Sequence, residues 1–345
     1  MKGVLLVNLG SPDSPSVKDV RKYLTQFLND PLVIDINPTA RFFLVNFIIV
    51  PFRAPKSAKL YKHIWTKEGS PLITHSLKQK DLVQKSLGDG YMVEVGMRYQ
   101  NPGIESAFKK LVEQKVESIV AIPLYPQWAS SSTESSIVEI KRVAKKFRFS
   151  NLEVVEKFYD NEDYLDALVD VALPSFVSTS KGETTFSLER TGWDFFVFSY
   201  HGLPERQITK IYPKYCEISN NCCSIISEKN KFCYRAACYQ TTRELVKRLN
   251  IPEGKYITSF QSRLDDRWLK PYSDKVIEQK SKEGVKKILV FSPAFVSDCL
   301  ETIYEIGIEY DHIFKQHGGE KLQMVESLNE NPKWIEALKK MVMTL

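Results

Sequence analysis

Eight short apolar runs, separated by stretches long enough for helices, constrain the fold of this chain more than any other feature. Most runs are rich in β-branched residues, as strands buried on both faces are. Between them lie amphipathic stretches such as Pro102–Gln114 and Ser135–Lys146. Alternation of strands and helices predicts parallel sheets with helices on both faces. The runs form two sets of four: Val4–Asn8, Met92–Met97, Ile119–Leu124 and Glu153–Phe158, then Asp194–Ser199, Tyr256–Phe260, Lys287–Phe291 and Leu322–Glu326.

The two sets resemble each other, which predicts two similar α/β domains. Pro126–Trp128 precedes Glu134 at the same spacing at which Pro293–Phe295 precedes Glu301. Ligands of such folds bind at the carboxyl ends of the strands, so we expect a binding cleft between the domains. The expected boundaries are 1–160, 161–330 and a final helix at 331–345.

Composition narrows the classes of partner. The chain has 345 residues and a formal net charge of +6. Its Lys and Arg residues are mixed with Asp and Glu, which is typical of solvated helix faces and not of a nucleic-acid surface. A weak attraction to anionic lipid stays open.

The sequence also bears on localisation. The N-terminus enters a strand-like run directly, and we read no export signal in it. The longest apolar run, Phe42–Phe52, is too short to span a bilayer but could form an apolar element on the surface. We therefore expect a cytoplasmic protein. Nucleotide binding is disfavoured, because Gly10-Ser11-Pro12 follows the first strand in place of a Gly-x-Gly-x-x-Gly turn.

His201 is the first candidate for chemistry. It follows the apolar run Phe195–Tyr200, and Gly202 and Pro204 turn the chain just after it. A histidine at the carboxyl end of a strand is well placed for proton transfer or metal contact. The alternative is an ordinary histidine satisfied within a loop.

A row of acids is the second candidate. Glu301, Glu305 and Glu309 recur at intervals of four, which places them on one face of a helix. Like charges at that spacing repel each other. The row is therefore either a solvated helix face or a carboxylate track that guides a divalent cation and accepts protons.

Five motifs, in order along nearly the whole chain, resemble those of ferrochelatases. The histidine motif is Phe198–Pro204 and the acidic motif is Phe295–Thr302; the others are Arg98-Tyr99, Tyr125–Trp128 and Gln261-Ser262 with Trp268. The resemblance implies two Rossmann-like, chelatase-type domains, each with a four-stranded parallel sheet flanked by helices, around a porphyrin cleft. It implies insertion of Fe²⁺ into protoporphyrin IX to form protohaem, the last step of haem biosynthesis.

The resemblance also implies roles for single residues. His201 corresponds to the invariant histidine of the family and Glu301 to its key carboxylate, both near the substrate iron, and Glu305 continues the acidic path. Some members have histidine at the position of Cys299, so a metal-ligand role there is doubtful. The segment from about 37 to 74 matches the lip of the porphyrin mouth, which we expect to give peripheral contact with the inner face of a membrane. The expected porphyrin-binding residues are Arg98, Tyr99, Tyr125, Trp128, Gln261, Ser262, Trp268, Phe42, Phe43 and Leu44.

Five cysteines lie in an insertion of the second domain, at about 212–238. They are Cys216, Cys222, Cys223, Cys233 and Cys238. In a cytoplasmic chain such clustering indicates metal, but the spacing matches no regular zinc finger. Four of these five thiolates suit a [2Fe–2S] cluster, and the segment resembles a cluster-bearing insertion of some bacterial ferrochelatases. We expect Cys216, Cys233 and Cys238 as ligands with either Cys222 or Cys223; zinc and free thiols are the alternatives.

Two other functions stay open on the sequence. One is a chelatase for coproporphyrin III or for another divalent metal. The other is a non-catalytic haem or iron sensor on a chelatase scaffold, which the presence of both His201 and Glu301 disfavours.

Overall fold

The computed structural model describes residues 1–176, 192–213, 215–219 and 221–345. These residues form two compact units. The first comprises Met1–Lys157 together with Trp334–Leu345, and the second comprises Phe158–Lys333. The final helix, α13 (Pro332–Met343), therefore lies almost entirely in the first unit.

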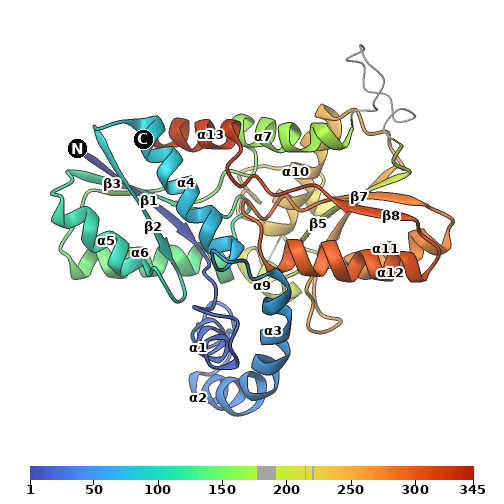
Figure 1. Ribbon diagram of the computed structural model, residues 1–345, viewed down its shortest axis with the longest axis horizontal. Helices are drawn as coiled ribbons and strands as arrows, with labels where there is room; N and C mark the ends of the chain where they lie inside the picture. The colour runs from blue at the N-terminus through green and yellow to red at the C-terminus, as the bar shows by residue number, and fades with distance from the viewer. Residues whose placement is uncertain (177–191, 214, 220) are drawn as a thin grey trace. The chain divides into compact units, whose positions relative to one another are not determined.

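Each unit holds one four-stranded parallel sheet, as the alternating pattern predicts (Figure 1). The strand orders are β2-β1-β3-β4 and β6-β5-β7-β8, so the two topologies are the same. The strands are β1 (Lys2–Asn8), β2 (Tyr91–Met97), β3 (Ser118–Pro123) and β4 (Leu152–Val154), then β5 (Phe195–His201), β6 (Tyr256–Gln261), β7 (Lys287–Phe291) and β8 (Lys321–Met324). The prediction of eight strands is confirmed. The fourth is shorter than expected, because only Ile119–Ala121 of β3 pair with it.

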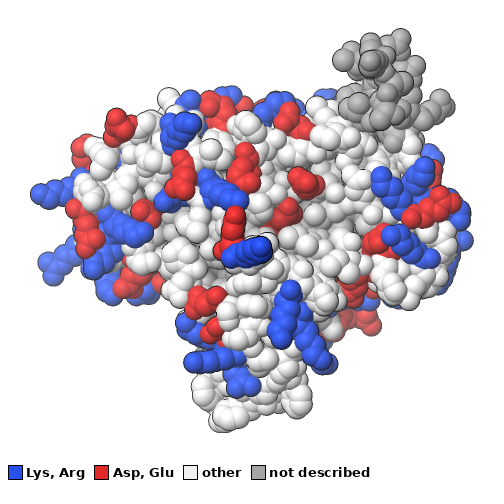
Figure 2. Space-filling view, viewed as in Figure 1, with Lys and Arg blue, Asp and Glu red and all other residues white. Residues whose placement is uncertain are grey.

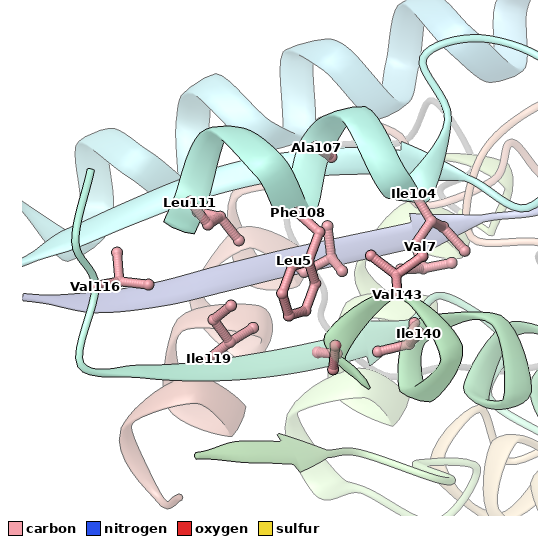
Figure 3. Packing of buried hydrophobic residues seen from close by; sticks show 12 residues of the cluster. Leu5, Val7, Ile104, Ala107, Phe108, Leu111, Val116, Ile119, Ile140 and Val143 are labelled. Atoms are coloured by element: carbon pink, nitrogen blue, oxygen red, sulfur yellow. The ribbon is translucent and has the colours of Figure 1, made fainter. Parts of the chain in front are cut away.

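The core of the first unit shows why the strands of its sheet are continuous apolar runs. Leu5 and Val7 of β1 face α5 (Ile104–Glu113) and α6 (Ser135–Lys146), where Phe108 fills the centre of a buried cluster (Figure 3). Val4 and Leu6 point the other way and are equally buried. A strand covered on both faces cannot alternate polar and apolar residues. Another helix of this unit, α4 (Pro71–Leu87), packs on β2.

A group of helices follows β1 and contains the predicted lip. It consists of α1 (Val17–Leu28), α2 (Pro38–Phe43), the π-helix η1 (Leu44–Ile49) and α3 (Val50–Ile64). Ser16 caps α1 by accepting a hydrogen bond from the amide of Asp19, and Asn37 caps α2 in the same way. α3 packs on α1 through Val50, Ala54, Ala58, Tyr61 and Ile64, which leaves its other side exposed.

Helices cover the second sheet as well. On one face α11 (Ser273–Lys282), the π-helix η5 (Glu301–Tyr310) and α12 (Asp311–Gln316) enclose a core with β5 and β7. The other helical elements of this unit are α7 (Glu162–Ala172), η3 (Leu173–Ser175), α9 (Glu205–Ile211), η4 (Asn221–Cys223) and α10 (Tyr234–Arg248). η2 (Ser130–Glu134) is the corresponding π-helix of the first unit.

The strand orders fix where a ligand site can form. In each sheet the second strand pairs with one edge of the first strand, and the third strand pairs with its other edge. The strand order therefore reverses at β1 and at β5. The carboxyl ends of the strands at such a switch point leave a crevice. Glycine follows both strands for a steric reason: a Cβ on Gly10 would lie 2.0 Å from the carbonyl oxygen of Tyr99, and one on Gly202 would lie 2.7 Å from that of Gln261.

Candidate functional site

His201 is the last residue of β5, at the switch point of the second sheet. Its Nδ1 lies 2.6 Å from the carbonyl oxygen of Gly202. Because a carbonyl only accepts, Nδ1 carries the proton in the neutral ring and Nε2 keeps its lone pair. The hydroxyl of Tyr234 donates to the backbone carbonyl of His201 over 2.8 Å and fixes the strand end. His201 is therefore a half-exposed proton acceptor on an anchored backbone.

Gln261 connects His201 to the acidic motif. It lies opposite His201 in the register of β5 and β6. Its side-chain oxygen accepts a hydrogen bond from Ser199 over 2.7 Å, and its Nε2 donates to the backbone carbonyl of Glu301 over 3.1 Å. The same edge of the sheet thus carries both predicted catalytic motifs.

Aromatic rings flank the histidine. The ring centroids of Trp268 and Phe295 lie 6.5 Å and 6.4 Å from that of His201. Trp268 is held by a bridge to Pro204, and it lies so close to Gly202 that a Cβ there would be 3.3 Å from the indole. Partly exposed aromatic surface beside a base is the lining expected for a planar, apolar substrate.

Glu305 is the most firmly held of the three acids. Its carboxylate accepts hydrogen bonds from the amide of Ser262 over 2.8 Å, from the hydroxyl of Ser262, and from Tyr310 over 2.8 Å. Gln261 contributes a longer one of 3.4 Å. Ser262 reaches this position with a φ of 62°, a conformation that non-glycine residues seldom adopt. The carboxylate is a fixed negative charge.

The acids do not form the uniform α-helical stripe that the spacing predicts. They lie on η5, a π-helix, whose wider turn gives each of them a different environment. Burial, followed by the nearby Glu301 carboxylate, raises the pKa of the Cys299 thiol well above its usual value. Glu309 is exposed, and desolvation together with the Glu305 carboxylate raises its pKa. The interpretation of the row as a plain solvated face does not fit Glu305.

In the first unit, Arg98 and Tyr99 belong to a buried polar network. Three donors converge on one carboxylate oxygen of Asp30: Nη2 of Arg98 at 2.6 Å, the hydroxyl of Tyr99 at 2.9 Å and that of Ser135 at 2.6 Å. Nε of Arg98 donates to the hydroxyl of Ser135 over 2.7 Å. Burial and Asp30 raise the pKa of Tyr99. Tyr99 is only 2% exposed, so its role in this structure is to help hold the carboxyl end of the first sheet.

The other predicted residues of the first unit are more accessible. Tyr125 and Trp128 are half-buried after β3, and the hydroxyl of Ser136 donates to that of Tyr125 over 3.4 Å. Phe42 and Phe43 end α2 with 53% and 56% of their surfaces exposed, and Leu44 opens η1 half-buried.

The cysteine segment folds as irregular chain with one short helical turn, η4, before α10 begins. The sulfurs of Cys222 and Cys223 lie 3.8 Å apart. Cys216 and Cys233 each act electrostatically on the thiols of Cys222 and Cys223, so the four thiols lie near one another. Cys238 is different: it lies inside α10 and is fully buried. Over the described ranges no three His, Cys, Asp or Glu side chains are arranged to hold a metal ion.

Comparison with known proteins decides the family. The ferrochelatase family model matches residues 1–345. The chain belongs to the ferrochelatase family.

Several named relatives agree with this membership. The chain is 42% identical over 342 residues to a ferrochelatase of Coxiella burnetii (strain CbuK_Q154), covering 98% of this chain and 92% of that protein. A ferrochelatase of Pseudomonas fluorescens (strain SBW25) is also 42% identical, covering 97% and 95%. One of Bdellovibrio bacteriovorus is 39% identical over 346 residues, covering 100% and 99%. Among solved structures, SirB from Bacillus subtilis with Fe³⁺ has a TM-score of 0.49 at 14% identity, covering 99% of this chain and 94% of SirB.

The structure of this ferrochelatase-family chain brings into the site several residues that no sequence motif indicates. Asp30 holds Arg98 and Tyr99, Tyr310 holds Glu305, and Tyr234 holds the carbonyl of His201. They lie 5 to 69 positions from their partners, and none belongs to a recognisable motif. A search for polar residues at helix and strand ends would have found Asp30, which follows α1. In the described part of the chain, each helix is too short or too polar to cross a bilayer.

Proposed function

We propose that this chain inserts Fe²⁺ into protoporphyrin IX to form protohaem, the last step of haem biosynthesis. It is an enzyme of the ferrochelatase family, as the match over the whole chain shows. The observation that carries the assignment of the site is the placement of His201, Gln261 and the Glu301 motif at one edge of the second sheet.

The proton chemistry of the reaction suits His201. Metal insertion replaces two pyrrole N–H protons of the porphyrin, and these leave only with a base nearby. Since Nδ1 is committed to the Gly202 carbonyl, Nε2 is the atom available to accept a proton. The imidazolium that results would keep its hydrogen bond to Gly202.

The carboxylates suit the iron. Fe²⁺ carries two positive charges that neighbouring anions stabilise as its water ligands are lost. Glu301 is half-exposed and free to approach the metal or a pyrrole proton, whereas Glu305 is tied to Ser262 and Tyr310. We therefore propose that Glu301 contacts the iron directly and that Glu305 supplies a fixed negative charge along the path of the iron.

Aromatic and aliphatic side chains are proposed to bind the porphyrin. Insertion needs a macrocycle bent so that its nitrogens point toward the metal, and a close-fitting apolar wall can supply that distortion from binding energy. Trp268 is a wall in the second unit; Tyr125, Trp128 and the lip residues Phe42, Phe43 and Leu44 are candidates in the first. Arg98 still has free guanidinium hydrogens on Nη1 and is 19% exposed, which leaves it able to meet a propionate.

The decisive assay measures protohaem formed anaerobically from protoporphyrin IX and Fe²⁺. Coproporphyrin III in place of protoporphyrin, and Co²⁺ or Zn²⁺ in place of Fe²⁺, test the alternative substrates. A matched pair of variants, His201→Ala and His312→Ala, separates catalysis from general damage, because His312 is an exposed residue of α12 that bonds only to Gln316 in its own helix. Turnover that is unchanged in His201→Ala, or absent in the wild type, contradicts the assignment. A wild-type protein that binds haem tightly but shows no turnover favours the sensor.

We further propose that the cysteine segment holds a [2Fe–2S] cluster. The local chemistry fits an anionic iron–thiolate group: Nη1 of Arg235 lies 3.1 Å from the sulfur of Cys223, and the carbonyl of Cys223 accepts from Arg243. Cys233 precedes α10, where the thiol of Cys223 and the backbone amide of Ala236 lower its pKa.

The proximity of four thiols favours one set of ligands for the cluster. It supports Cys216, Cys222, Cys223 and Cys233, whereas Cys238 is fully buried inside α10. When bound, such a cluster supplies cross-linking of the segment and redox sensitivity; metal insertion into the porphyrin uses neither. Iron and acid-labile sulfide analysis of anaerobically purified protein tests it, and one zinc per chain would contradict it.

A third proposal concerns localisation: a cytoplasmic protein in peripheral contact with the inner face of a membrane through the lip. Its support is the exposed apolar surface of Phe42 and Phe43, which are in contact with each other and with Phe47. Solvent-exposed clusters of this kind mark interaction surfaces. Fractionation of cells into soluble and membrane pools tests this contact.

A further inference from the structure

The positive charge of the chain is concentrated around the lip. Residues 36–67, the part of this region that lies between Asp35 and Glu68, contain six Lys and Arg residues and no Asp or Glu. Since the whole chain has 48 basic and 42 acidic residues, the 42 basic residues outside this segment equal the acidic ones. The formal net charge of +6 therefore resides in about a tenth of the sequence.

The structure places most of this charge on the exposed side of α3. Arg53, Lys56, Lys59 and Lys62 alternate with the buried residues that pack on α1, and all four are exposed. None of them forms an ion pair within the described ranges. Lysines elsewhere in the same unit differ: Lys110 pairs with Glu94. Four cations on one helix, none of them in an ion pair, form a positive field.

An exposed apolar cap adjoins this basic side. Phe47, Ile48 and Phe52, with 63%, 58% and 72% of their surfaces exposed, lie on η1 and the first turn of α3. In Figure 2 the lowest surface of the tip at the bottom of the view is white, and Lys and Arg, with a few Asp and Glu, lie above it. Apolar residues in front and cations behind are the arrangement of an interfacial membrane anchor.

We infer that the lip docks on anionic phospholipid and not on a neutral bilayer, with the cap entering the headgroup boundary and the basic side of α3 meeting the lipid charges. This rests on the membrane contact proposed above and names its partner. The charge pattern favours lipid over an acidic protein, because the cations flank a solvent-exposed apolar cap. Each basic residue near such a surface raises binding about fivefold at low salt.

Vesicle sedimentation tests the inference with the full-length protein. The vesicles are pure phosphatidylcholine, or phosphatidylcholine with about a quarter phosphatidylglycerol, at about 0.05 M and 0.3 M salt. We expect binding to the anionic vesicles that weakens at the higher salt, and much weaker binding to the neutral ones. The triple variant Lys56→Gln, Lys59→Gln, Lys62→Gln should lose roughly 100-fold in partition coefficient on the anionic vesicles.

A matched control removes equal charge elsewhere in the unit. Lys115→Gln, Lys141→Gln, Lys145→Gln changes three exposed lysines outside the lip and should bind like the wild type. Equal binding to both vesicle types, or an α3 triple variant that behaves like this control, overturns the inference while leaving an apolar membrane contact intact. No binding to any vesicle overturns both. Protohaem formation from detergent-dispersed porphyrin should be unchanged in both triple variants, which keeps these outcomes separate from the assignment of the reaction.

Discussion

Substitution of Asp30 by asparagine tests the buried network behind Arg98 and Tyr99. Asp30 is 6% exposed, and its pairing with Arg98 is a buried ion pair with an N–O distance of 2.6 Å. Asparagine keeps the shape of the side chain but removes its charge. Its NH2 group must face either the three donors that now bind Oδ2 or the backbone N–H of Leu32 that now binds Oδ1, and none of these can accept a hydrogen bond from it. The Arg98 charge is then left without its counter-ion.

The magnitude follows from that geometry. Removal of one partner from a buried pair costs about 3–5 kcal/mol, which is a large part of the roughly 5–15 kcal/mol that stabilises a typical domain. For a unit of this size the melting temperature should fall by about 6–20 °C. Urea unfolding followed by circular dichroism gives the change in free energy from the midpoint and slope.

The matched control is Glu113→Gln in the same unit. Glu113 pairs with Lys109 over 3.5 Å, and both side chains are about 60% exposed, so its loss should cost under about 1 kcal/mol. An Asp30→Asn variant no less stable than this control refutes the argument. A double-mutant cycle with Arg98→Met adds a second check: the double variant should lose less stability than the two single losses together.

Three further predictions concern the reaction and the cluster. His201→Ala should abolish formation of protohaem while porphyrin still binds, which absorbance titration and turnover measure separately. Glu301→Gln should lower turnover at limiting Fe²⁺ by at least about tenfold, because the amide keeps the shape but loses charge and basicity, whereas Glu309→Gln on the exposed side of η5 should change it little. Cys216→Ser and Cys233→Ser should each remove iron and acid-labile sulfide and lower the melting temperature, because ligation and folding are coupled in such segments.

The outcomes that contradict these three predictions differ. Near-normal turnover without His201 would remove it from catalysis. Equal effects of the two glutamate variants would show that η5 acts only through its total charge. Retention of sulfide in either cysteine variant, with Cys299→Ser as the control for an unrelated buried thiol, would exclude that residue as a ligand.

Much of the fold follows from the sequence, because burial on both faces leaves a mark in the composition of each strand. Lys287–Phe291 was placed without error, and β1 differs only at its start. Ser135–Lys146 also matches α6, since its apolar residues recur at the helical period. The two-domain division remains a prediction at the level of its boundaries, although the compact units change at residues 157 and 333.

The parts of the site that lie at the ends of strands could be predicted from the sequence. His201 and Gln261 end neighbouring parallel strands, so the sequence already places them at one edge of a sheet. The position of the Glu301 motif after β7 has the same origin.

The sequence by itself therefore determined the strands, helices such as Ser135–Lys146, and the strand-end positions of His201 and Gln261, because each depends on local periodicity. Tertiary structure alone decided which polar groups meet. Asp30 reaches Tyr99 across 69 positions, Ser262 reaches Glu305 across 43, and Cys223 meets Cys233 in a segment with no regular period. The π-helical form of η5 belongs to the same class, since the spacing of its acids fits an α-helix equally well. Such contacts form when folding buries polar groups that must then be satisfied, and no local pattern records which distant residue will satisfy them.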